Sequence, residues 1–554
     1  VVLSSSVTEN GYNIVQCTGV PTLSLVLRVN GVVNIRQYGA TSSTDALDSI
    51  QYALNSGAKV VTGDSIGVFT ISAPLSIPSG VTFDLKGTIK AGDIKTGELS
   101  TRGALVTMYG VSQAKLLNAT LLPSDTAYAL GASFSGVVII DGASTECQVL
   151  GCDIDATGIN TTNPAFTEGV TCLGSFCLVD NNKITAGGVR YATATSSSNK
   201  VSNNKIYGGQ ISGNVNTSTD VSYGHIIDNN TLIFPTRMGI EDQGQPQNNQ
   251  FLSGTRITNN TIVGGNTPEF FAISAVSTNT IITGNSIVNW GNEYAIEIFS
   301  DYSVTFSNNS IVWTDGNPND VIGIQSQISP YEGGANLISN NVITGAKRNV
   351  NTACINIRGE SRTVVTGNSF YGCSNILLCS TNIVECTFTD NAVLMSTLAT
   401  ENRTLITGGD NFIAKGNRVK YDSTVTGTAY NERVFQAGWD GTIIDGNFID
   451  GGNVVNNGAV LGFLSNGVTG TNVKIINNNF KSGTRIDYSH LIDPVVDNNE
   501  IDGAKTQHSR VAKGFYDATP IVKQSVTGSK GSNVALTDLI AKLVLLGLIN
   551  DSTT

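Results

Sequence analysis

The chain has 554 residues, of which only 14% are charged, and its formal net charge at pH 7 is −11. Nucleic-acid binding needs clustered Lys and Arg, and an anionic membrane repels an acidic surface, so the composition excludes both partners. No apolar run reaches the roughly 18 residues that a membrane-spanning helix needs, so the sequence predicts no membrane insertion.

Residues 1–56 are predicted to form a lead-in and a capping helix. Segment 1–33 has a mixed composition and is expected to hold strands. Leu47, Ile50 and Leu54 are spaced like one face of a helix, and Thr44 or Asp45 is placed to cap it. Such a helix can close the open end of a solenoid, which otherwise exposes apolar side chains.

Asparagines recur along residues 181–505 in the pattern apolar–x–(Asn/Gly/Asp)–Asn–x–apolar. The mean spacing of roughly 26 residues is typical of a solenoid. Asn tolerates the left-handed backbone region and suits a tight turn, and stacked Asn side chains can bond one another. We therefore predict an all-β fold, a right-handed single-stranded parallel β-helix over residues 57–510. The recurring residues are Asn182, Asn204, Asn230, Asn260, Asn285, Asn309, Asn341, Asn368, Asn391, Asn417, Asn447, Asn479 and Asn499.

Nine cysteines are present, mostly inside apolar stretches that read as strands. We interpret them as small buried residues rather than as disulfides or metal ligands. The chain has only three His and no CxxC spacing, so no structural metal and no cofactor is expected. Reduced thiols favour assembly in a host cytoplasm.

Aligning the coils on their Asn residues places five strands side by side, from 238–244 to 354–360. One apolar residue in each is expected to point inward: Ile240, Ile273, Ile296, Ile324 and Ile355. Alternation sends the next residue outward. The predicted outward row is Glu241, Ser274, Glu297, Gln325 and Asn356, and a second outward row is Gln243, Val276, Phe299, Gln327 and Arg358.

Glu241 and Glu297 lie two coils apart in this alignment, which predicts roughly 9–10 Å between their Cα atoms. Glycosidases use two carboxyl groups, about 5–5.5 Å apart for retention and about 6.5–9.5 Å for inversion. The spacing favours an inverting hydrolase, in which one Glu protonates the leaving oxygen and the other activates water. Asp242 and Asp301 lie beside them and can replace either. Asp153, Asp155 and Glu168 form a second acidic patch.

Aromatic and polar residues crowd the same region. Flat rings stack on sugar faces, and Tyr and Trp also bond hydroxyls, although each ring can instead pack beneath a loop. Long insertions between the Asn marks are expected to wall the groove. The predicted substrate-binding residues are Arg237, Gln243, Trp290, Tyr294, Phe299, Tyr302, Trp313, Gln325 and Arg358.

Residues 511–554 differ from the coils. Asn533 is a plausible N-cap, Gly547 a plausible stop, and an apolar stripe lies between them, formed by Leu536, Leu539, Ile540, Leu543 and Leu546. A helix of about 13 residues is marginal alone. We expect three copies to associate, which predicts a homotrimer; the alternative is that the helix folds back on its own chain.

Residues 34–54 resemble the opening motif of the pectate-lyase-like superfamily. The matching residues are Asn34, Tyr38-Gly39-Ala40, Thr44-Asp45, Ser49-Ile50-Gln51 and Ala53-Leu54. Phage tailspikes and capsule depolymerases are common in this superfamily, as are pectinases and other lyases. The resemblance therefore implies a β-helix and a polysaccharide substrate.

The combined prediction is a trimeric tailspike-type endo-glycosidase that hydrolyses a bacterial capsule or O-antigen without a cofactor. A tailspike is expected to join the phage tail or baseplate through an N-terminal part preceding this chain. Three alternatives stay open. A polysaccharide lyase would use Arg358 or Arg237, with Asp242 and Asp301 as calcium ligands. A non-catalytic adhesin would bind without cleaving, and an esterase would release acetate only.

Overall fold

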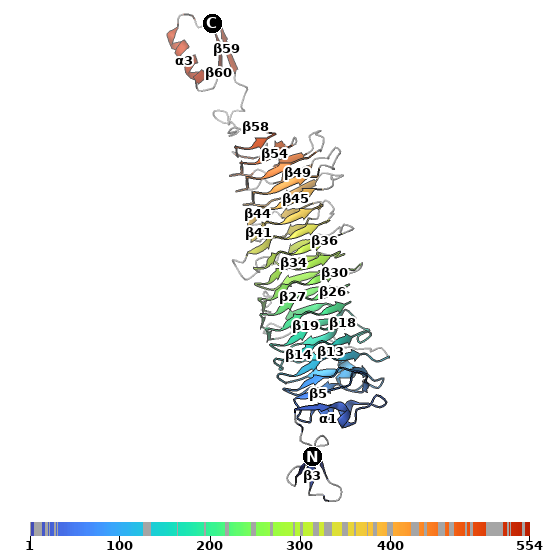
Figure 1. The fold of residues 1–554 in the computed structure, drawn as a ribbon. Helices are drawn as coiled ribbons and strands as arrows, with labels where there is room; N and C mark the ends of the chain where they lie inside the picture. Colours follow the sequence, from blue (N-terminus) through green and yellow to red (C-terminus); the bar gives the residue numbers. More distant parts are fainter. Residues whose placement is uncertain are drawn as a thin grey trace.

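The computed structural model shows one long stack of coils with the two termini at opposite ends (Figure 1). The residues that the structure describes are 2–4, 14–16, 20, 23–26, 29, 31–125, 135–162, 164–192, 195–215, 221–244, 251–265, 270–291, 294–299, 303–313, 321–325, 335–345, 353–358, 362–373, 375–379, 385–395, 403–422, 432–436, 440–452, 460–464, 470–481, 485–487, 491–492, 494–502, 504–505, 524–528, 531, 533–545 and 549–553.

Each coil contributes one short strand to each of three parallel sheets, as in β25 (Ile226–Asp228), β26 (Thr231–Ile233) and β27 (Ile240–Gly244). Sheet 1 runs from β4 (Val32–Asn34) to β56 (Val495–Asp497), and sheet 2 from β6 (Val68–Ile71) to β57 (Glu500–Ile501). Sheet 3 has 16 strands, from β7 (Leu75–Ser76) to β55 (Arg485–Asp487). The predicted all-β parallel β-helix is confirmed.

The core is the inside of this coil stack. In the three-residue strands β25 and β26 the middle side chain is buried and its neighbours are half-buried or exposed, because side chains alternate between the two faces of a strand. Ile227, Leu232 and Ile240 are the inward residues of one coil, and each is fully buried. The next coil places Ile257, Ile262 and Ile273 at the same levels. Inward residues of the same kind therefore stack on one another from coil to coil along the axis.

The repeated Asn pattern forms the turn between sheet 1 and sheet 2. The first residue of the pair has a positive φ, as at Asn229 (54°), Gly284 (70°) and Asp390 (54°), which explains why only Asn, Gly and Asp occupy it. The second is the buried ladder residue. Asn230 donates from its side chain to Asn260 Oδ1 (3.0 Å) and to Val201 O (2.9 Å), and its backbone N–H also reaches Asn260 Oδ1 (2.9 Å).

The ladder runs unbroken from Asn182 to Asn499, as predicted, with one correction. In the run 477–479 the ladder residue is Asn478, which bonds Asn499 Oδ1 (2.9 Å), and not Asn479. Asn479 instead begins β54 (Asn479–Lys481). Three consecutive Asn residues left the frame of this turn ambiguous in the sequence.

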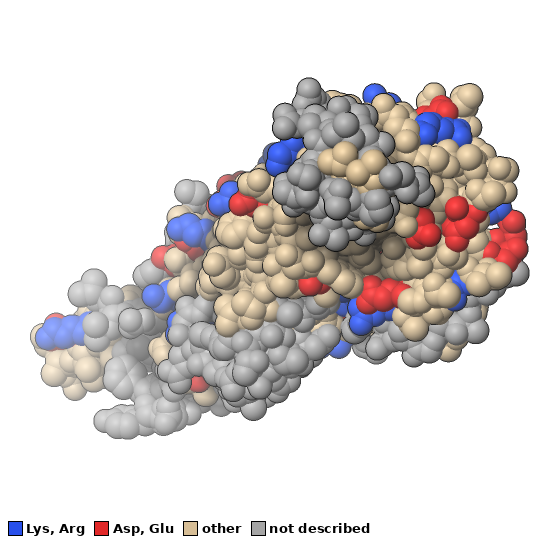
Figure 2. All heavy atoms as spheres, turned by 90° about the horizontal axis from the view of Figure 1, so that it is seen from below, with Lys and Arg blue, Asp and Glu red and all other residues tan. Residues whose placement is uncertain are grey.

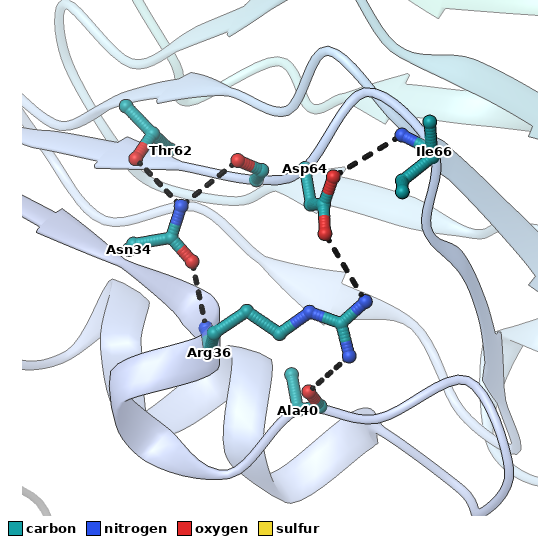
Figure 3. Close-up of polar contacts among 7 residues, drawn as sticks. Asn34, Arg36, Ala40, Thr62, Asp64 and Ile66 are labelled. Atoms are coloured by element: carbon teal, nitrogen blue, oxygen red, sulfur yellow. Dashed lines mark hydrogen bonds and ion pairs between the residues drawn. The ribbon is translucent and has the colours of Figure 1, made fainter.

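The N-terminal end is closed by a short cap (Figure 3). Asn34 accepts from Arg36 N–H (2.9 Å) and donates to Gly63 O (2.9 Å), which joins the 3₁₀ turn η1 (Ile35–Tyr38) to the first coils. The Arg36 guanidinium pairs with Asp64 (3.2 Å) and donates to Ala40 O (3.0 Å). These contacts fix the chain segment that leads into the capping helix.

The predicted capping helix is α1 (Leu47–Leu54), and it buries Ile50, Ala53 and Leu54 against the first coils. Asp45 Oδ1 accepts from Leu47 N–H (3.1 Å) at its start. Of the expected face, Leu47 is only partly buried. Further along, the described coils contain two other short helical turns, α2 (Glu98–Arg102) and η2 (Pro164–Phe166).

Small elements lie beyond both ends of the stack (Figure 1). Before it, β1 (Val2–Ser4), β2 (Ile14–Gln16) and β3 (Ser24–Val26) form an antiparallel sheet. After it come β59 (Gln524–Gly528), α3 (Val534–Leu545) and β60 (Ile549–Thr553), with β59 and β60 paired in parallel. Among the described residues no helix is long and apolar enough to span a bilayer.

The cysteines lie in the core, as predicted. All eight in the described part of the chain are buried, and none of these eight forms a disulfide: Cys147, Cys152, Cys172, Cys177, Cys354, Cys373, Cys379 and Cys386. Burial raises the pKa of Cys152 to about 12. Cys17 lies outside the described residues.

Charged side chains of both signs are scattered over a mostly uncharged surface in the view from the N-terminal end (Figure 2). Surface ion pairs such as Lys183–Asp153 (2.9 Å) and Arg362–Glu385 (3.7 Å) are solvent-exposed and contribute little to stability. Those on the outer face of sheet 3 are buried, and they mark the candidate site.

Candidate active site

Glu241 and Glu297 lie on one outward row of sheet 3. Glu241 in β27 pairs in register with Ser274 in β31 (Ile273–Val276), and Ser274 pairs with Glu297 in β34 (Ile296–Phe299). The two carboxylates are therefore separated by one intervening strand. The predicted register of these three residues is confirmed.

Further along the row the predicted register needs correction. In β37 (Ile322–Gln325) the residue level with Ile296 is Ile322, not Ile324, and the residue level with Glu297 is Gly323, not Gln325. Gln325 pairs with Phe299, in the second row. Asn356 in β40 (Ile355–Ile357) follows Gly323 as predicted.

Glu241 is buried against Arg237. The Arg237 guanidinium bonds Glu241 Oε2 at 3.0 Å, and the Glu241 side chain is 2% exposed. The guanidinium also lies over the rings of Phe166 (5.0 Å) and Phe270 (5.5 Å). Glu241 Oε1 has no hydrogen-bond partner. One carboxylate oxygen is thus fixed, and the other is buried without a hydrogen-bond partner.

Glu297 is held by the residue between the two carboxylates. Ser274 Oγ donates to Glu297 Oε2 at 2.6 Å, and Gln243 Nε2 donates to Ser274 Oγ at 3.4 Å. Gln243, a predicted substrate-binding residue, therefore contacts this site. Asp301 and Tyr302, which were expected beside Glu297, lie outside the described residues, as does the side chain of Gln325.

A third carboxylate reaches this face because the chain bulges. In β16 (Thr167–Cys172) an extra residue, Gly169, interrupts the pairing with β19 (Gly188–Ala192). Glu168, just before the bulge, forms a buried ion pair with Arg190 (3.1 Å). Burial raises the pKa of Glu168, while Arg190 opposes that shift and the charge of Glu241 adds to it. Glu168 and Glu241 therefore share one electrostatic environment.

The predicted second acidic patch does not assemble. Asp153 and Asp155 lie on β15 (Asp153–Asp155) of sheet 2, where Asp153 pairs with Lys183, whereas Glu168 lies on sheet 3. Sequence proximity was misleading because consecutive strands of a coil face different directions.

A strip of rings and guanidiniums runs along the same face. Arg237 lies between Phe166 and Phe270; Phe270 contacts Phe271 (6.3 Å), which stacks on Tyr294 (5.8 Å, 9°). Arg358 lies over Tyr294 at 5.3 Å. The strip therefore links β16 to β40. Of its members, Arg237, Tyr294 and Arg358 were predicted from the sequence to bind substrate.

Three of the predicted site residues point elsewhere. Trp290 is fully buried and donates from Nε1 to Phe270 O (2.7 Å), and Trp313 donates to Trp290 O (2.7 Å), so both indoles pack inside the stack. Phe299 is half-buried and packs against the core. Aromatic character alone does not predict whether a ring faces the core or the surface.

Asp242 points into the core, away from the outer face of sheet 3. It accepts hydrogen bonds from Tyr191 Oη (2.6 Å), Thr255 Oγ1 (2.8 Å), Thr280 Oγ1 (3.1 Å) and Ser277 Oγ. Burial raises the pKa of Asp242, and these hydrogen bonds oppose that shift. The prediction that Asp242 can replace Glu241, or ligate calcium in the groove, is wrong for this arrangement.

Tyr191 connects the core to the site. It is the extra residue of a second bulge, between Arg190 and Ala192, and its ring passes over Gly213, where a Cβ would lie 2.3 Å from Tyr191 Cζ. Its hydroxyl also reaches Glu241 O (3.3 Å). Tyr191 thus lies inward, beneath Glu241, while Arg190, before the bulge, keeps its outward register with Ser212.

A hollow of about 530 Å³ lies far from these carboxylates, beside the N-terminal cap, between Ser42–Asp45, Thr70–Ser72 and Gly92–Ile94. Five of its ten lining residues carry hydroxyl groups, and its two charged residues, Asp45 and Asp93, are exposed. The outer face of sheet 3, which carries the buried Glu168, Arg190 and Glu241, is the stronger candidate for chemistry.

No known protein family and no curated protein matches this chain. Solved structures to which it is similar include the Escherichia coli bacteriophage HK620 tailspike with a pentasaccharide, at 13% identity and a TM-score of 0.38, covering 84% of both chains. The Streptococcus pneumoniae adhesin PfbA has 13% identity and a TM-score of 0.40, covering 73% of this chain and 99% of that one. The catalytic domain of a GH87 alpha-1,3-glucanase with nigerose has 12% identity and a TM-score of 0.33, covering 87% and 71%. Such likenesses concern the fold, which the registers above establish independently.

Proposed function

We propose that this chain is a tailspike-type endo-glycosidase that binds and hydrolyses a bacterial surface polysaccharide. The observation that supports this most directly is the outward row Glu241–Ser274–Glu297, two carboxylates flanking one strand beside a strip of aromatic rings. One Glu protonates the leaving oxygen while the other activates water, and no redox step is needed.

The geometry favours inversion. Two strand spacings place the two Cα atoms roughly 9–10 Å apart. Carboxyl groups in inverting glycosidases are about 6.5–9.5 Å apart, which leaves room for a water molecule. Arg237 and Ser274 each hold one carboxylate oxygen, which limits the rotation of both groups.

The strip has the length that a polymer substrate requires. A series of five contacts, each 5.0–6.3 Å long, joins Phe166 beside β16 to Arg358 beside β40, so the strip is several ring widths long. Rings and guanidinium planes spaced along that length can stack on successive sugar units. An endo-acting enzyme needs such a multi-unit contact.

We further propose that the protein acts as a homotrimer on a phage tail and is assembled in the host cytoplasm. Helix α3 supports the first point. Val534, Leu536 and Leu539 on it are 80%, 39% and 53% exposed, so its apolar residues are left for another chain.

The test is chain shortening of purified capsule and O-antigen polysaccharides, followed by size-exclusion chromatography. We expect the wild-type protein to shorten one of them, and Glu241→Gln and Glu297→Gln each to lower the rate at least ~100-fold, since general acid–base groups contribute about 10²–10⁴-fold. Glu385→Gln, on sheet 1 and 61% exposed, is the matched control and should keep the wild-type rate.

Other outcomes identify the alternatives. Binding without shortening of any polymer would establish an adhesin. Products with the ultraviolet absorbance of a new double bond would establish a lyase, and acetate release at constant chain length an esterase. If both Glu variants cleaved the polymer at the wild-type rate, the catalytic groups would lie outside this row. Asp301→Asn would then be the next variant to test.

A further inference from the structure

We propose that the polar cluster formed by Glu168, Gln210, Ser212 and Glu241 is a binding site for an uncharged, hydroxyl-rich sugar unit. The inference rests on the proposed function and specifies its substrate class at one position of the groove. Glu168, Gln210 and Ser212 have no part in the two-carboxylate chemistry of Glu241 and Glu297.

The first observation is a concentration of unpartnered polar atoms. Among the described residues ten buried side-chain N and O atoms have no hydrogen-bond partner, and five of them belong to this cluster. The other five are spread over separate coils. The five atoms of the cluster are Glu168 Oε2, Gln210 Oε1, Gln210 Nε2, Ser212 Oγ and Glu241 Oε1.

The second observation is that these residues are neighbours on sheet 3. Ser212 in β23 (Ile211–Val215) pairs directly with Glu241, and Gln210 lies two residues before Ser212 on the same outward side. Gly188 adjoins Gln210, and a Cβ at Gly188 would lie only 3.0 Å from Glu168 Oε2. The same Cβ would lie 2.1 Å from Gln210 O, so the glycine lets the Gln210 backbone approach the Glu168 carboxyl group closely.

All four residues are at least nine-tenths buried, so bulk water does not satisfy them: their exposed fractions are 0% for Glu168, 4% for Gln210, 0% for Ser212 and 1% for Glu241. Leaving buried polar groups unpaired lowers stability. Two β-bulges, at Gly169 and Tyr191, also distort the strands here, and bulges are often found beside binding sites.

The chemistry of the cluster selects the ligand. Carboxylate oxygens accept, while the Gln amide and the Ser hydroxyl both donate and accept, a mixture that matches adjacent hydroxyl groups of a sugar. Both nearby guanidiniums are already engaged, Arg190 by Glu168 (3.1 Å) and Arg237 by Glu241 (3.0 Å). Neither guanidinium is therefore left to bind the carboxylate of a uronic acid, and the two acidic side chains repel it.

An apolar surface suited to a sugar ring lies beside these polar groups. Phe166 is half-buried and packs on the Arg237 guanidinium, whose charged end reaches Glu241. A sugar bound with its hydroxyls toward Ser212 and Gln210 can place one face on this ring.

The test uses two near-isosteric changes, Ser212→Ala and Gln210→Met, and two readouts. The same changes on other faces, Ser286→Ala on sheet 2 and Gln148→Met on sheet 1, are the matched controls. The probes are immobilised capsule and O-antigen polysaccharides of known composition, one set neutral and one set containing uronic acids. The readouts are the binding affinity and the melting temperature of the full-length protein.

We expect the wild-type protein to bind a neutral polysaccharide, and Ser212→Ala and Gln210→Met each to weaken that binding about 3- to 10-fold, the value of one ordinary hydrogen bond. The melting temperature should stay equal or rise, because each change removes an unpaired buried polar group. The controls should leave binding unchanged.

Four results would overturn the inference. A lower melting temperature in both variants with unchanged binding would show that the groups have structural partners. Wild-type affinity in both variants, with a neutral polymer still cleaved, would refute the cluster alone and leave the proposed function standing. Exclusive binding of uronic-acid polymers would refute the neutral ligand, and no binding to any polymer would refute both proposals.

Discussion

Asp242 and Glu241 are sequence neighbours with opposite environments, because alternate side chains of a strand face opposite sides of the sheet. Asp242 serves the core, where four hydroxyl groups converge on it. We expect Asp242→Ala to leave those hydroxyls unpaired and to lower the free energy of unfolding by about 2–4 kcal/mol.

Chemical denaturation of Asp242→Ala beside Asp153→Ala is the measurement for this expectation. Asp153 is 47% exposed in a surface ion pair, so its removal should cost less than about 1 kcal/mol. Equal stability of the two variants would contradict the assignment of Asp242 to the core.

His225 makes the stability of the coils depend on pH. Its Nδ1 accepts the backbone N–H of Asn199 (3.2 Å), and its Nε2 bonds Ser222 Oγ (2.8 Å), so the folded protein needs the neutral ring. Burial lowers the pKa of His225 from 6.5 to about 4. The unfolded chain therefore binds a proton that the folded chain does not, and stability falls as the pH drops from about 6.5 towards 4.

The expected size of this effect is about 3 kcal/mol, from the shift between 6.5 and about 4. The measurement is the difference in unfolding free energy between the wild-type protein and His225→Gln at several pH values. That difference should be constant above pH ~7 and shrink or change sign below pH ~6. A difference that is constant down to pH ~4 would contradict a neutral buried imidazole.

At the scale of the element, the Asn turn combines two residues with separate tasks. The first adopts the left-handed conformation, and the second is a ladder residue that bonds the coils on either side. Asn285 accepts from Asn260 N–H (2.9 Å) and donates to Ile257 O (2.9 Å). We expect Asn285→Ala to cost about 1–3 kcal/mol, because it leaves the buried Asn260 N–H unpaired.

The matched control is Asn259→Gly, one residue before a ladder position, at φ 56° and on the exposed side of the turn. Glycine adopts that conformation freely, so this change should alter the melting temperature far less. Equal losses of melting temperature in both variants would contradict a stabilising role of the ladder hydrogen bonds.

The turn and the strands around it were predictable because their residues are locally determined. The positive φ restricts one position to Asn, Gly or Asp, and the ladder fixes the next, so the coil repeat and the Glu241–Ser274–Glu297 row follow from alignment. The register of β37 could not be predicted from this alignment. Ile322 and Ile324 both face inward, and a shift by two residues preserves the alternation, so the hydrophobic pattern cannot distinguish the two registers.

The bulges were not predictable from alternation because they break it. Gly169 adds one residue to its strand and so turns Glu168 onto the site face, whereas Tyr191 adds one residue after Arg190, which faces outward by ordinary alternation. The available signal was Gly next to a charged residue in TEGVT, since Gly inside a strand often marks a bulge. The predictions for Trp290 and Trp313 were wrong for another reason: an aromatic ring is suited both to a core and to a sugar-binding site.

At the scale of the whole molecule, the C-terminal helix leaves apolar residues uncovered. Asn533 Oδ1 caps it by accepting from Leu536 N–H (3.1 Å), as predicted, and Ile540 is buried while Leu536 and Leu539 remain exposed. We expect three chains to associate, so light scattering should give close to three times 58.0 kDa. Deletion of 533–554 should weaken or slow that assembly, and a stable full-length monomer would contradict the trimer.

The stacking of one strand per coil has a consequence for stereochemistry. Carboxylates on one outward row can be separated only by whole strand spacings, about 4.8 Å for one and roughly 9–10 Å for two. The shorter spacing resembles the carboxyl separation of retaining glycosidases, about 5–5.5 Å, and the longer one approaches that of inverting glycosidases. We expect the wild-type protein to release product of inverted anomeric configuration, measured by proton NMR during hydrolysis. In the double variant Ser274→Glu with Glu297→Ser the second carboxylate moves one strand closer to Glu241, and the residual activity should then proceed with retention.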